Sequence, residues 1–254
     1  MRPHVLILGG TTEARELGLA LCDRELATTI SLAGRTATPA AQPVPVRRGG
    51  FGGADGLAAY LLTERIDFLV DATHPYAESI SANAARAAAR TNTPILAVRR
   101  PPWTAVDGDV WIEVSDAQDA VRALGERSRR VFLAVGRQEL SPFAAAPQHQ
   151  YFIRSVDPVE PPLAVPHAHY ILARGPFTES DDRALLESLC IDVIVAKNSG
   201  GRATYSKIEA ARMLGIPILL FRRPAVADCP CVATVAEAVA WLDHAVSLAA
   251  PRGV

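Results

Sequence analysis

Short apolar runs alternate along the chain with Ala- and Leu-rich segments of helical length. In the first part of the sequence the apolar runs lie at residues 4–8, 29–33, 67–72 and 94–98, and helices are predicted over about 12–22 and 78–90. Strands that are separated by helices predict parallel βαβ units with right-handed crossovers. Because these strands are apolar throughout, we expect a sheet that is covered by helices on both faces.

The same alternation begins again after residues 103–115, which interrupt it. Further strands are predicted at 130–136, 151–156, 169–175, 191–198 and 216–224, followed by a last helix over 235–248. That helix is preceded by a capping box, in which Thr234 and Glu237 are expected to bond to each other's backbone N–H groups.

The two halves of the sequence resemble each other. The segment "IDFLVDATHP" from residue 66 matches "IDVIVAKNSG" from 191, and "TPILAVRRP" from 93 matches "IPILLFRRP" from 216. We therefore predict an α/β protein with two Rossmann-like domains and mainly parallel sheets, over residues 1–105 and 106–254. Cofactor and substrate are expected in the interdomain cleft, because such sheets bind ligands beyond the carboxyl ends of their strands. The alternative is one long doubly wound sheet.

Composition narrows the class of protein. The chain has 254 residues, of which 49% are hydrophobic, and a formal net charge of −1, which is typical of a soluble globular protein and argues against a nucleic-acid-binding surface. No apolar run is long enough to cross a membrane and no signal-peptide pattern begins the chain, so we expect a cytoplasmic protein. Four scattered cysteines, and a His74 without a second histidine at a ligand spacing, predict neither a disulfide framework nor a metal site.

The turn after the first strand is the first candidate site. In "LGGTTEAREL", residues 8–17, Gly9 and Gly10 stand between strand and helix, where an approaching anion meets no Cβ atom. Thr11 or Thr12 is expected to cap the helix, whose free N–H groups would face a phosphate. The full G-x-G-x-x-G fingerprint is absent, so a tight turn without a ligand is the alternative.

The loop after the second strand bears on the choice of cofactor. NAD-binding proteins usually carry an acid there, whereas this chain has Arg35 and Thr36. An arginine suits a 2′-phosphate, so NADPH is favoured over NADH. The alternative is an arginine that merely lies on the surface.

The loop after the strand at 67–70 is the third candidate. The segment "DATHPYAES" places Thr73, His74 and Tyr76 around Pro75, which fixes the turn. A wall of the cofactor site at this place is one interpretation. A lone histidine in a turn is, however, more often a hydrogen-bonding residue than an acid or base.

Both lysines of the chain, Lys197 and Lys207, stand close together around an Asn-Ser-Gly-Gly turn, whereas every other basic side chain is arginine. The turn follows a predicted strand, and Lys207 falls in the first turn of a helix that Ser206 and Glu209 are expected to open as a second capping box. A cation there opposes the helix dipole, so we expect an anion between the two lysines. The alternative is a pair of solvated lysines on a flexible loop.

Several arginines also end strands of the second half, among them Arg137, Arg154 and Arg174. Those that face the expected cleft would make it cationic in a protein of nearly neutral charge. Such a local field favours a small polyanionic substrate.

Six motifs, "ILGGTTEAREL", "DATHPYA", "GRQEL", "ARGPF", "AKNSGG" and "KIEAAR", follow one another along nearly the whole chain. Together they resemble the precorrin-6A reductase family of cobalamin biosynthesis. The resemblance implies a monomeric or weakly associating cytosolic enzyme that reduces its tetrapyrrole substrate, precorrin-6A, to precorrin-6B with NADPH, by hydride transfer to C19 and protonation of C18. A related enzyme of the anaerobic branch uses NADH and the cobalt-bearing substrate. Arg35 favours the metal-free reaction.

The resemblance also implies roles for residues by their position in the motifs. The dinucleotide would be held by Gly9, Gly10, Thr11, Thr12, Glu13, Arg35, Thr36, Thr73, His74, Pro75, Asn198 and Ser199. The substrate would be bound by Arg137, Arg174, Lys197, Ser199, Gly200, Gly201, Thr204 and Lys207. The donor of the proton to C18 is left open between Lys197, Tyr76, His74 and water.

Two other classes of protein are alternatives to a reductase of this family. A non-catalytic nucleotide or tetrapyrrole carrier would explain the loops but not why two of them are expected to face one cleft. A short-chain carbonyl reductase would require a lysine four residues after a tyrosine, and residues 193 and 203 are Val and Ala.

Overall fold

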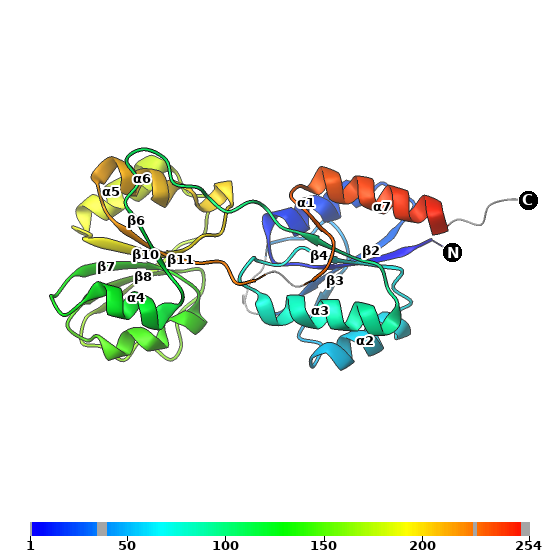
Figure 1. The fold of residues 1–254 in the computed structure, drawn as a ribbon, viewed down its shortest axis with the longest axis horizontal. Helices are drawn as coiled ribbons and strands as arrows, with labels where there is room; N and C mark the ends of the chain where they lie inside the picture. The colour runs from blue at the N-terminus through cyan, green and yellow to red at the C-terminus, as the bar shows by residue number, and fades with distance from the viewer. Residues whose placement is uncertain (1, 35–39, 226–227, 250–254) are drawn as a thin grey trace, which may run out of the picture. The chain divides into compact units, whose positions relative to one another are not determined.

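The computed structural model describes residues 2–34, 40–225 and 228–249 and divides the chain into two compact units. Unit 1 comprises the residues up to Pro101 together with those from Pro224 onward, and unit 2 comprises Pro102–Arg223. Each unit is built around one six-stranded sheet (Figure 1). The prediction of an α/β fold with two Rossmann-like domains is confirmed, and the alternative of one long sheet is wrong.

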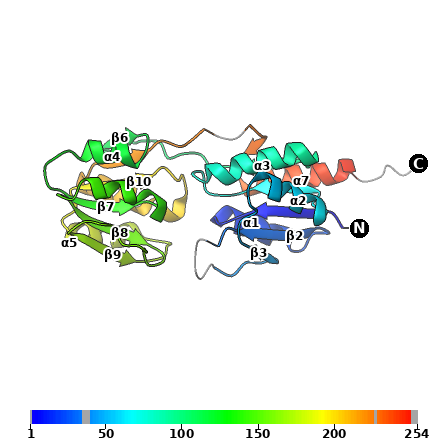
Figure 2. The same ribbon diagram turned by 90° about the horizontal axis from the view of Figure 1, so that it is seen from below.

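The sheet of unit 1 has the order β12-β5-β4-β1-β2-β3, and all of its strand pairs are parallel. Its strands are β1 His4–Leu8, β2 Ala27–Leu32, β3 Val46–Arg48, β4 Phe68–Asp71, β5 Ile95–Val98 and β12 Cys231–Val232. In Figure 2 β2 and β3 lie toward one edge of this sheet. The central strand β1 and its neighbour β4 therefore end side by side.

Helices cover both faces of this sheet. They are α1 Thr12–Leu21, α2 Ala54–Thr63, α3 Glu78–Thr91 and α7 Val235–Ala249. Val5 and Ile7 of β1 are buried in the core that α1 and α7 share, whereas Leu6 and Leu8 are buried in the core beneath α2 and α3 (Figure 1). Successive side chains of a strand point to opposite faces, so an apolar strand fills both cores.

Unit 2 repeats this plan with the strand order β6-β11-β10-β7-β8-β9, again entirely parallel. Its strands are β6 Trp111–Val114, β7 Arg130–Ala134, β8 Gln150–Ser155, β9 Ala168–Leu172, β10 Val193–Lys197 and β11 Ile218–Phe221. Its helices are α4 Ala117–Leu124, α5 Glu179–Ser188 and α6 Ser206–Leu214, with the 3₁₀-helices η1 Arg137–Glu139, η2 Ser141–Ala145 and η3 Arg202–Thr204. Leu186 of α5 and Ile208 of α6 share one core with Phe132 and Ile194 of the sheet.

The chain leaves unit 1 after β5 and returns to it after β11, which the predicted boundary did not anticipate. β12 pairs in parallel with β5, and α7 buries Ala238 and Leu242 in the core that α1 also covers. The predicted second domain, 106–254, is therefore wrong for residues from 224 onward. The reason is that edge pairing and apolar burial attach this segment to a sheet far from it in sequence.

Two helix starts test the predicted capping boxes. Thr234 and Glu237 form theirs: the Glu237 N–H donates to Thr234 Oγ1 at 3.2 Å, and the Thr234 N–H donates to Glu237 Oε2 at 2.9 Å. The box at α6 is wrong, because Ser206 Oγ donates instead to Asp182 Oδ2 at 2.6 Å. In the described part of the chain, the model has no helix that is both long enough and apolar enough to cross a membrane.

Candidate active site

The turn between β1 and α1 has the conformation that its glycines predict. A Cβ atom on Gly9 would lie 2.8 Å from Ile30 Cγ2, and Gly10 has a φ of +116°, which side chains rarely tolerate. The space beside Gly10 is open, since an added Cβ there would meet no atom within 4 Å. A ligand can therefore approach the backbone closely at the carboxyl end of β1, the central strand.

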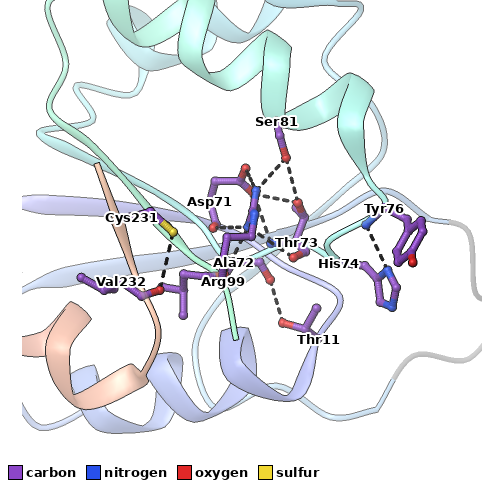
Figure 3. A network of polar contacts seen from close by, with 11 residues as sticks. Thr11, Asp71, Ala72, Thr73, His74, Tyr76, Ser81, Arg99, Cys231 and Val232 are labelled. Atoms are coloured by element: carbon purple, nitrogen blue, oxygen red, sulfur yellow. Dashed lines mark hydrogen bonds and ion pairs between the residues drawn. The ribbon is translucent and has the colours of Figure 1, made fainter. Parts of the chain in front are cut away.

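Thr11 fixes this turn to the neighbouring strand. Its Oγ1 accepts from the Ala14 N–H at 3.1 Å, so Thr11 and not Thr12 is the N-cap of α1. The same hydroxyl donates to the carbonyl of Ala72, just beyond β4, at 2.7 Å (Figure 3). Thr12 begins the helix and is exposed. The Thr11 side chain thus fixes the N-terminus of α1 relative to the ends of β1 and β4.

Glu13 places a carboxylate in the first turn of α1. Its Oε2 accepts from Arg100 Nη1, which follows β5, at 2.5 Å, and both side chains are mostly buried. The guanidinium neutralises an acid that would otherwise repel an anion at this helix end. The pair therefore leaves the N-terminus of α1 compatible with a phosphate.

A buried ion pair between Asp71 and Arg99 lies at the end of β4. Asp71 Oδ2 accepts from Arg99 Nη2, and their side chains are 2% and 9% exposed. Asp71 Oδ1 accepts from the N–H and the hydroxyl of Thr73 at 3.1 and 2.7 Å, while Arg99 also donates to Ser81 Oγ at 2.8 Å (Figure 3). Thr73 thus forms its hydrogen bonds within the interior of unit 1. These bonds fix the start of the loop that follows Thr73.

The loop beyond Thr73 carries the predicted acid–base residues of unit 1. His74 Nδ1 accepts from the Tyr76 N–H at 3.3 Å, so a neutral His74 carries its proton on Nε2. The centroids of the His74 and Tyr76 rings lie 5.7 Å apart, with an interplanar angle of 37° (Figure 3). Both rings are only partly buried.

Lys197 ends β10 in unit 2 and is paired with an acid. Its Nζ donates to Glu139 Oε1 at 2.6 Å, and 16% of the lysine side chain is exposed. Glu139 lies in η1, directly after β7. Its second oxygen, Oε2, is buried without a hydrogen-bond partner among the described residues, and it would lie 2.5 Å from a Cβ on Gly136. Glu139 therefore follows β7 as Glu13 follows β1, and Lys197 ends β10 as Asp71 ends β4.

The loop after Lys197 is anchored by its own polar groups. The Asn198 amide accepts from the Trp103 N–H at 2.7 Å and donates to the Trp103 carbonyl at 2.9 Å, and its backbone carbonyl accepts from Arg223 Nε at 2.8 Å. Ser199 Oγ and Thr204 Oγ1 lie 3.0 Å apart across the glycines of the loop. Within unit 2, Asn198 thus connects the loop to Trp103, near the start of the unit, and to Arg223 at its end.

Lys207 has an environment unlike that of a solvated lysine. It is 4% exposed, and its Nζ donates to the carbonyl of Thr204 and lies 5.0 Å from the centroid of the Trp103 ring. Burial lowers its pKa to about 7, and the nearby Arg154 contributes to this shift, whereas Asp182 opposes it. The predicted first-turn position is confirmed, but the side chain lies inside unit 2.

Comparisons with known proteins identify the family. The sequence model of the family "Precorrin-6x reductase CbiJ/CobK" matches residues 4–243. A precorrin-6A reductase from Sinorhizobium sp is 58% identical over 244 residues, which cover 96% of this chain and 94% of that protein. This chain belongs to the precorrin-6x reductase family. The family places it among the oxidoreductases of cobalamin biosynthesis and implies a nicotinamide cofactor.

Other members support the same assignment. A solved structure of CobK precorrin-6A reductase matches with a TM-score of 0.93 and 48% identity, covering 99% of this chain and 100% of that chain. A cobalt-precorrin-6A reductase from Priestia megaterium is 28% identical over 233 residues, which cover 87% of this chain and 91% of that protein. The fold is thus shared by a solved precorrin-6A reductase.

The described residues bring together two of the predicted groups. In unit 1, Gly9, Gly10, Thr11, Thr12 and Glu13 share one turn, and Thr11 connects it to the segment that bears Thr73, His74, Pro75 and Tyr76. In unit 2, Lys197, Asn198, Ser199, Gly200, Gly201 and Thr204 share one loop. Arg35 and Thr36 lie outside the described residues.

Three predicted substrate ligands lie outside the segment of residues 197–204. Arg137 is exposed at the start of η1 and donates to the Pro158 carbonyl at 3.4 Å. Arg174 is exposed after β9. Lys207 is buried behind Thr204. Of these three, only the two arginines present their side chains to solvent.

The most informative residue that sequence reasoning missed is Glu139. Its partner Lys197 is far away along the chain, so no local pattern relates them. A signal was nevertheless present, because Glu139 holds the same position after Gly136 that Glu13 holds after Gly10. Arg99, Trp103 and Asp182 were also missed, since their roles depend on contacts between separate elements.

Proposed function

We propose that this protein is an NADPH-dependent precorrin-6A reductase that delivers a hydride to C19 and a proton to C18, giving precorrin-6B. The observation that carries the proposal is the turn of Gly9, Gly10 and Thr11 at the end of β1, in a chain of a reductase family. Open backbone beside Gly10 and a capped helix N-terminus fit the pyrophosphate of a dinucleotide. When bound, the dinucleotide would supply the hydride.

Unit 1 would hold the cofactor through its backbone and its paired charges. Residues 9–13 would surround the pyrophosphate, and Arg100 would keep the Glu13 carboxylate from repelling it. The loop bearing Thr73, His74 and Pro75 would line the ribose and nicotinamide side, because Thr11 holds it next to the turn. Orientation of this kind is the main contribution that a protein makes to hydride transfer.

Unit 2 would bind the substrate through the loop that begins at Lys197. Precorrin-6A carries several carboxylates, and a carboxylate that approaches Lys197 would compete with Glu139 for its Nζ. Backbone N–H groups at Gly200 and Gly201 and the hydroxyls of Ser199 and Thr204 would add hydrogen bonds. Arg137 and Arg174 of the same unit would supply exposed positive charge.

The proton for C18 would come from Lys197, Tyr76, His74 or water. Lys197 has its proton held toward Glu139 at 2.6 Å, and a neutral His74 would offer its proton from Nε2. Tyr76 would offer its phenol, which is partly exposed. Comparing solvent isotope effects in Lys197→Met, Tyr76→Phe and His74→Gln variants separates these donors, since only loss of the true donor changes the isotope effect on the protonation step.

Two features favour NADPH and the metal-free substrate. Arg35 follows the second strand, where a guanidinium would pair with the 2′-phosphate. The relative named for precorrin-6A shares 58% of its aligned residues with this chain, whereas the relative named for cobalt-precorrin-6A shares 28%. We therefore propose that the protein reduces the cobalt-free ring. We further propose that it is a cytoplasmic protein that is monomeric or weakly associating.

The test is turnover of precorrin-6A with either cofactor. Loss of reduced-nicotinamide absorbance with NADPH, together with a product heavier by two hydrogens, is expected. Arg35→Ala should raise KM for NADPH about tenfold and leave KM for NADH unchanged, which corresponds to about 1.4 kcal/mol. Arg2→Ala, an exposed arginine at the amino end of β1, is the control. Tetrapyrrole binding without cofactor oxidation would instead indicate a carrier.

A further inference from the structure

Lys207 holds together two segments that are separate in sequence. It lies in the first turn of α6, and its Nζ donates to the carbonyl of Thr204, the last residue of η3. The same ammonium lies 5.0 Å from the centroid of the Trp103 ring, near the start of unit 2. A cation over an indole face and on a carbonyl is attracted by both.

These two partners are also the anchors of the loop that begins at Lys197. Thr204 Oγ1 lies 3.0 Å from Ser199 Oγ, and the backbone of Trp103 is bonded on both its N–H and its carbonyl by the Asn198 amide. Asn198 and Ser199 are therefore held by the residues that Lys207 touches. A change at Lys207 reaches the loop through two routes.

The charges around Lys207 do not balance. Within the described residues, Arg154 on β8 and Asp182 on α5 are the charged groups that act on it, while η3 and Trp103 contribute a carbonyl and an uncharged ring. Asp182 already accepts from Arg154 Nη1 at 2.5 Å and from Ser206 Oγ at 2.6 Å. One carboxylate thus serves two cations, so a protonated Lys207 is destabilised by its surroundings.

We propose that Lys207 is a positioning residue, which as a neutral amine holds the loop of residues 197–204 in place and loosens it on gaining a proton. Its importance for catalysis rests on the proposed function, whereas the titration of Lys207 and the order of the loop do not. A lysine kept only for packing would not need its charge, because an apolar side chain fills such a space at lower cost.

The direct test uses the fact that the chain has two lysines. Lysine labelled with ¹³C at Cε gives two signals in the intact protein, and Lys197→Arg identifies the one that belongs to Lys207. That signal should titrate with a midpoint near pH 7, where burial places the pKa of Lys207. A Lys207 signal that moves only near the ordinary lysine pKa of about 10.4 would overturn the proposal.

Hydrogen exchange tests whether that proton controls the loop. In the wild type, protection of the amides of residues 198–204 should rise about fivefold or more between pH 6 and pH 8, after correction for the intrinsic exchange rate. In Lys207→Met, which carries no charge at this position, the protection should not change between these pH values. Glu209→Gln, which removes a charge from the same helix, should behave like the wild type. Wild-type protection that is as independent of pH as that of Lys207→Met would contradict the proposal.

Stability separates a positioning role from a structural one. Because the folded-state pKa of Lys207 lies below its unfolded value of 10.5, the unfolded chain binds more protons between pH 7 and 10.5, so wild-type stability should rise with pH there. Lys207→Met should lose this rise and have a higher Tm than the wild type at pH 6. A structural lysine would give a lower Tm at every pH.

Kinetics connect the loop to the reaction. In the wild type, KM for precorrin-6A should rise about tenfold from pH 8 to pH 6 while kcat changes less, and Lys207→Met should abolish this fall of kcat/KM below pH 7. A pH profile identical to that of the wild type would overturn the proposal. Absence of turnover in the wild type would instead reject the proposed function, and the signals of Lys207 and of its loop would still decide the inference.

Discussion

The two units share a sheet order but differ in the segment after their central strand. In unit 1, β1 leads through Gly9 and Gly10 into α1, a helix of 10 residues capped by Thr11. In unit 2, β7 leads through Gly136 into the short 3₁₀-helices η1 and η2. The first turn presents a helix N-terminus, whereas the second presents a carboxylate paired with a lysine. One fold therefore provides two different chemical sites.

The buried charges differ in the same way. In unit 1, Asp71 and Arg99 form a pair with one charge of each sign, and Thr73 and Ser81 complete its hydrogen bonds. In unit 2, one carboxylate faces two cations. Balanced charges are expected where a loop must stay fixed. Unbalanced charges with shifted pKa values are more typical of functional sites.

The largest expected effect comes from breaking the balanced pair. Arg99→Met should lower the free energy of unfolding by about 3–5 kcal/mol, because it leaves the buried Asp71 without a counter-charge. Arg154→Met should cost less, about 1–3 kcal/mol, since Asp182 keeps the Ser206 bond and the nearby Lys207. Urea unfolding measures both.

The double variant Asp71→Leu with Arg99→Met is the control for this comparison. It removes both charges together and should recover most of the stability that Arg99→Met loses. Equal losses in the two single variants would mean that the units do not differ in their charge balance.

The next effect concerns catalysis. Lys197→Ala should lower kcat/KM for precorrin-6A about 10²-fold, a loss of about 3 kcal/mol, because it removes the cation that ends β10. Lys197→Arg should retain part of the activity, and Arg122→Ala, an exposed cation of α4, should retain all of it. Steady-state kinetics of variants whose Tm equals that of the wild type test this prediction. Unchanged kinetics in Lys197→Ala would remove this lysine from the site.

A smaller effect is expected at the cap of α1. Thr11→Val loses the bond from the Ala14 N–H and the bond to the Ala72 carbonyl, so unfolding should become easier by about 1 kcal/mol and KM for NADPH should rise. Thr11→Ser keeps the hydroxyl and should restore both values. If the two variants have the same Tm and the same KM, the hydroxyl does not orient the turn.

Sequence periodicity predicted most strands of the parallel sheets, because an apolar strand is a local pattern. It missed the edge strands β3 and β6, and the segment 103–115, which was expected to interrupt the pattern, contains β6. Repeated motifs likewise predicted two units of similar plan. The return of the chain to unit 1 was not predictable in this way, since β12 has two residues and its place depends on pairing with β5. A strand this short carries no periodicity of its own.

The site was predictable only where a residue's role follows from its neighbours in sequence. Thr11 capped its helix as expected, since an N-cap is a local arrangement. Ser206 did not, because Asp182 on another helix accepts its hydroxyl. The pairing of Glu139 with Lys197 and the burial of Lys207 likewise depend on elements that the fold brings together.

Calorimetric titration of NADPH into matched glycine variants tests the central comparison most directly. An added methyl at Gly10 meets an unfavourable φ of +116° beside the expected pyrophosphate, whereas at Gly136 it meets the Glu139 carboxylate in unit 2. The account predicts that Gly10→Ala weakens NADPH binding about tenfold or more and that Gly136→Ala changes Kd less than about twofold. Weakened binding in Gly136→Ala with unchanged binding in Gly10→Ala would contradict it.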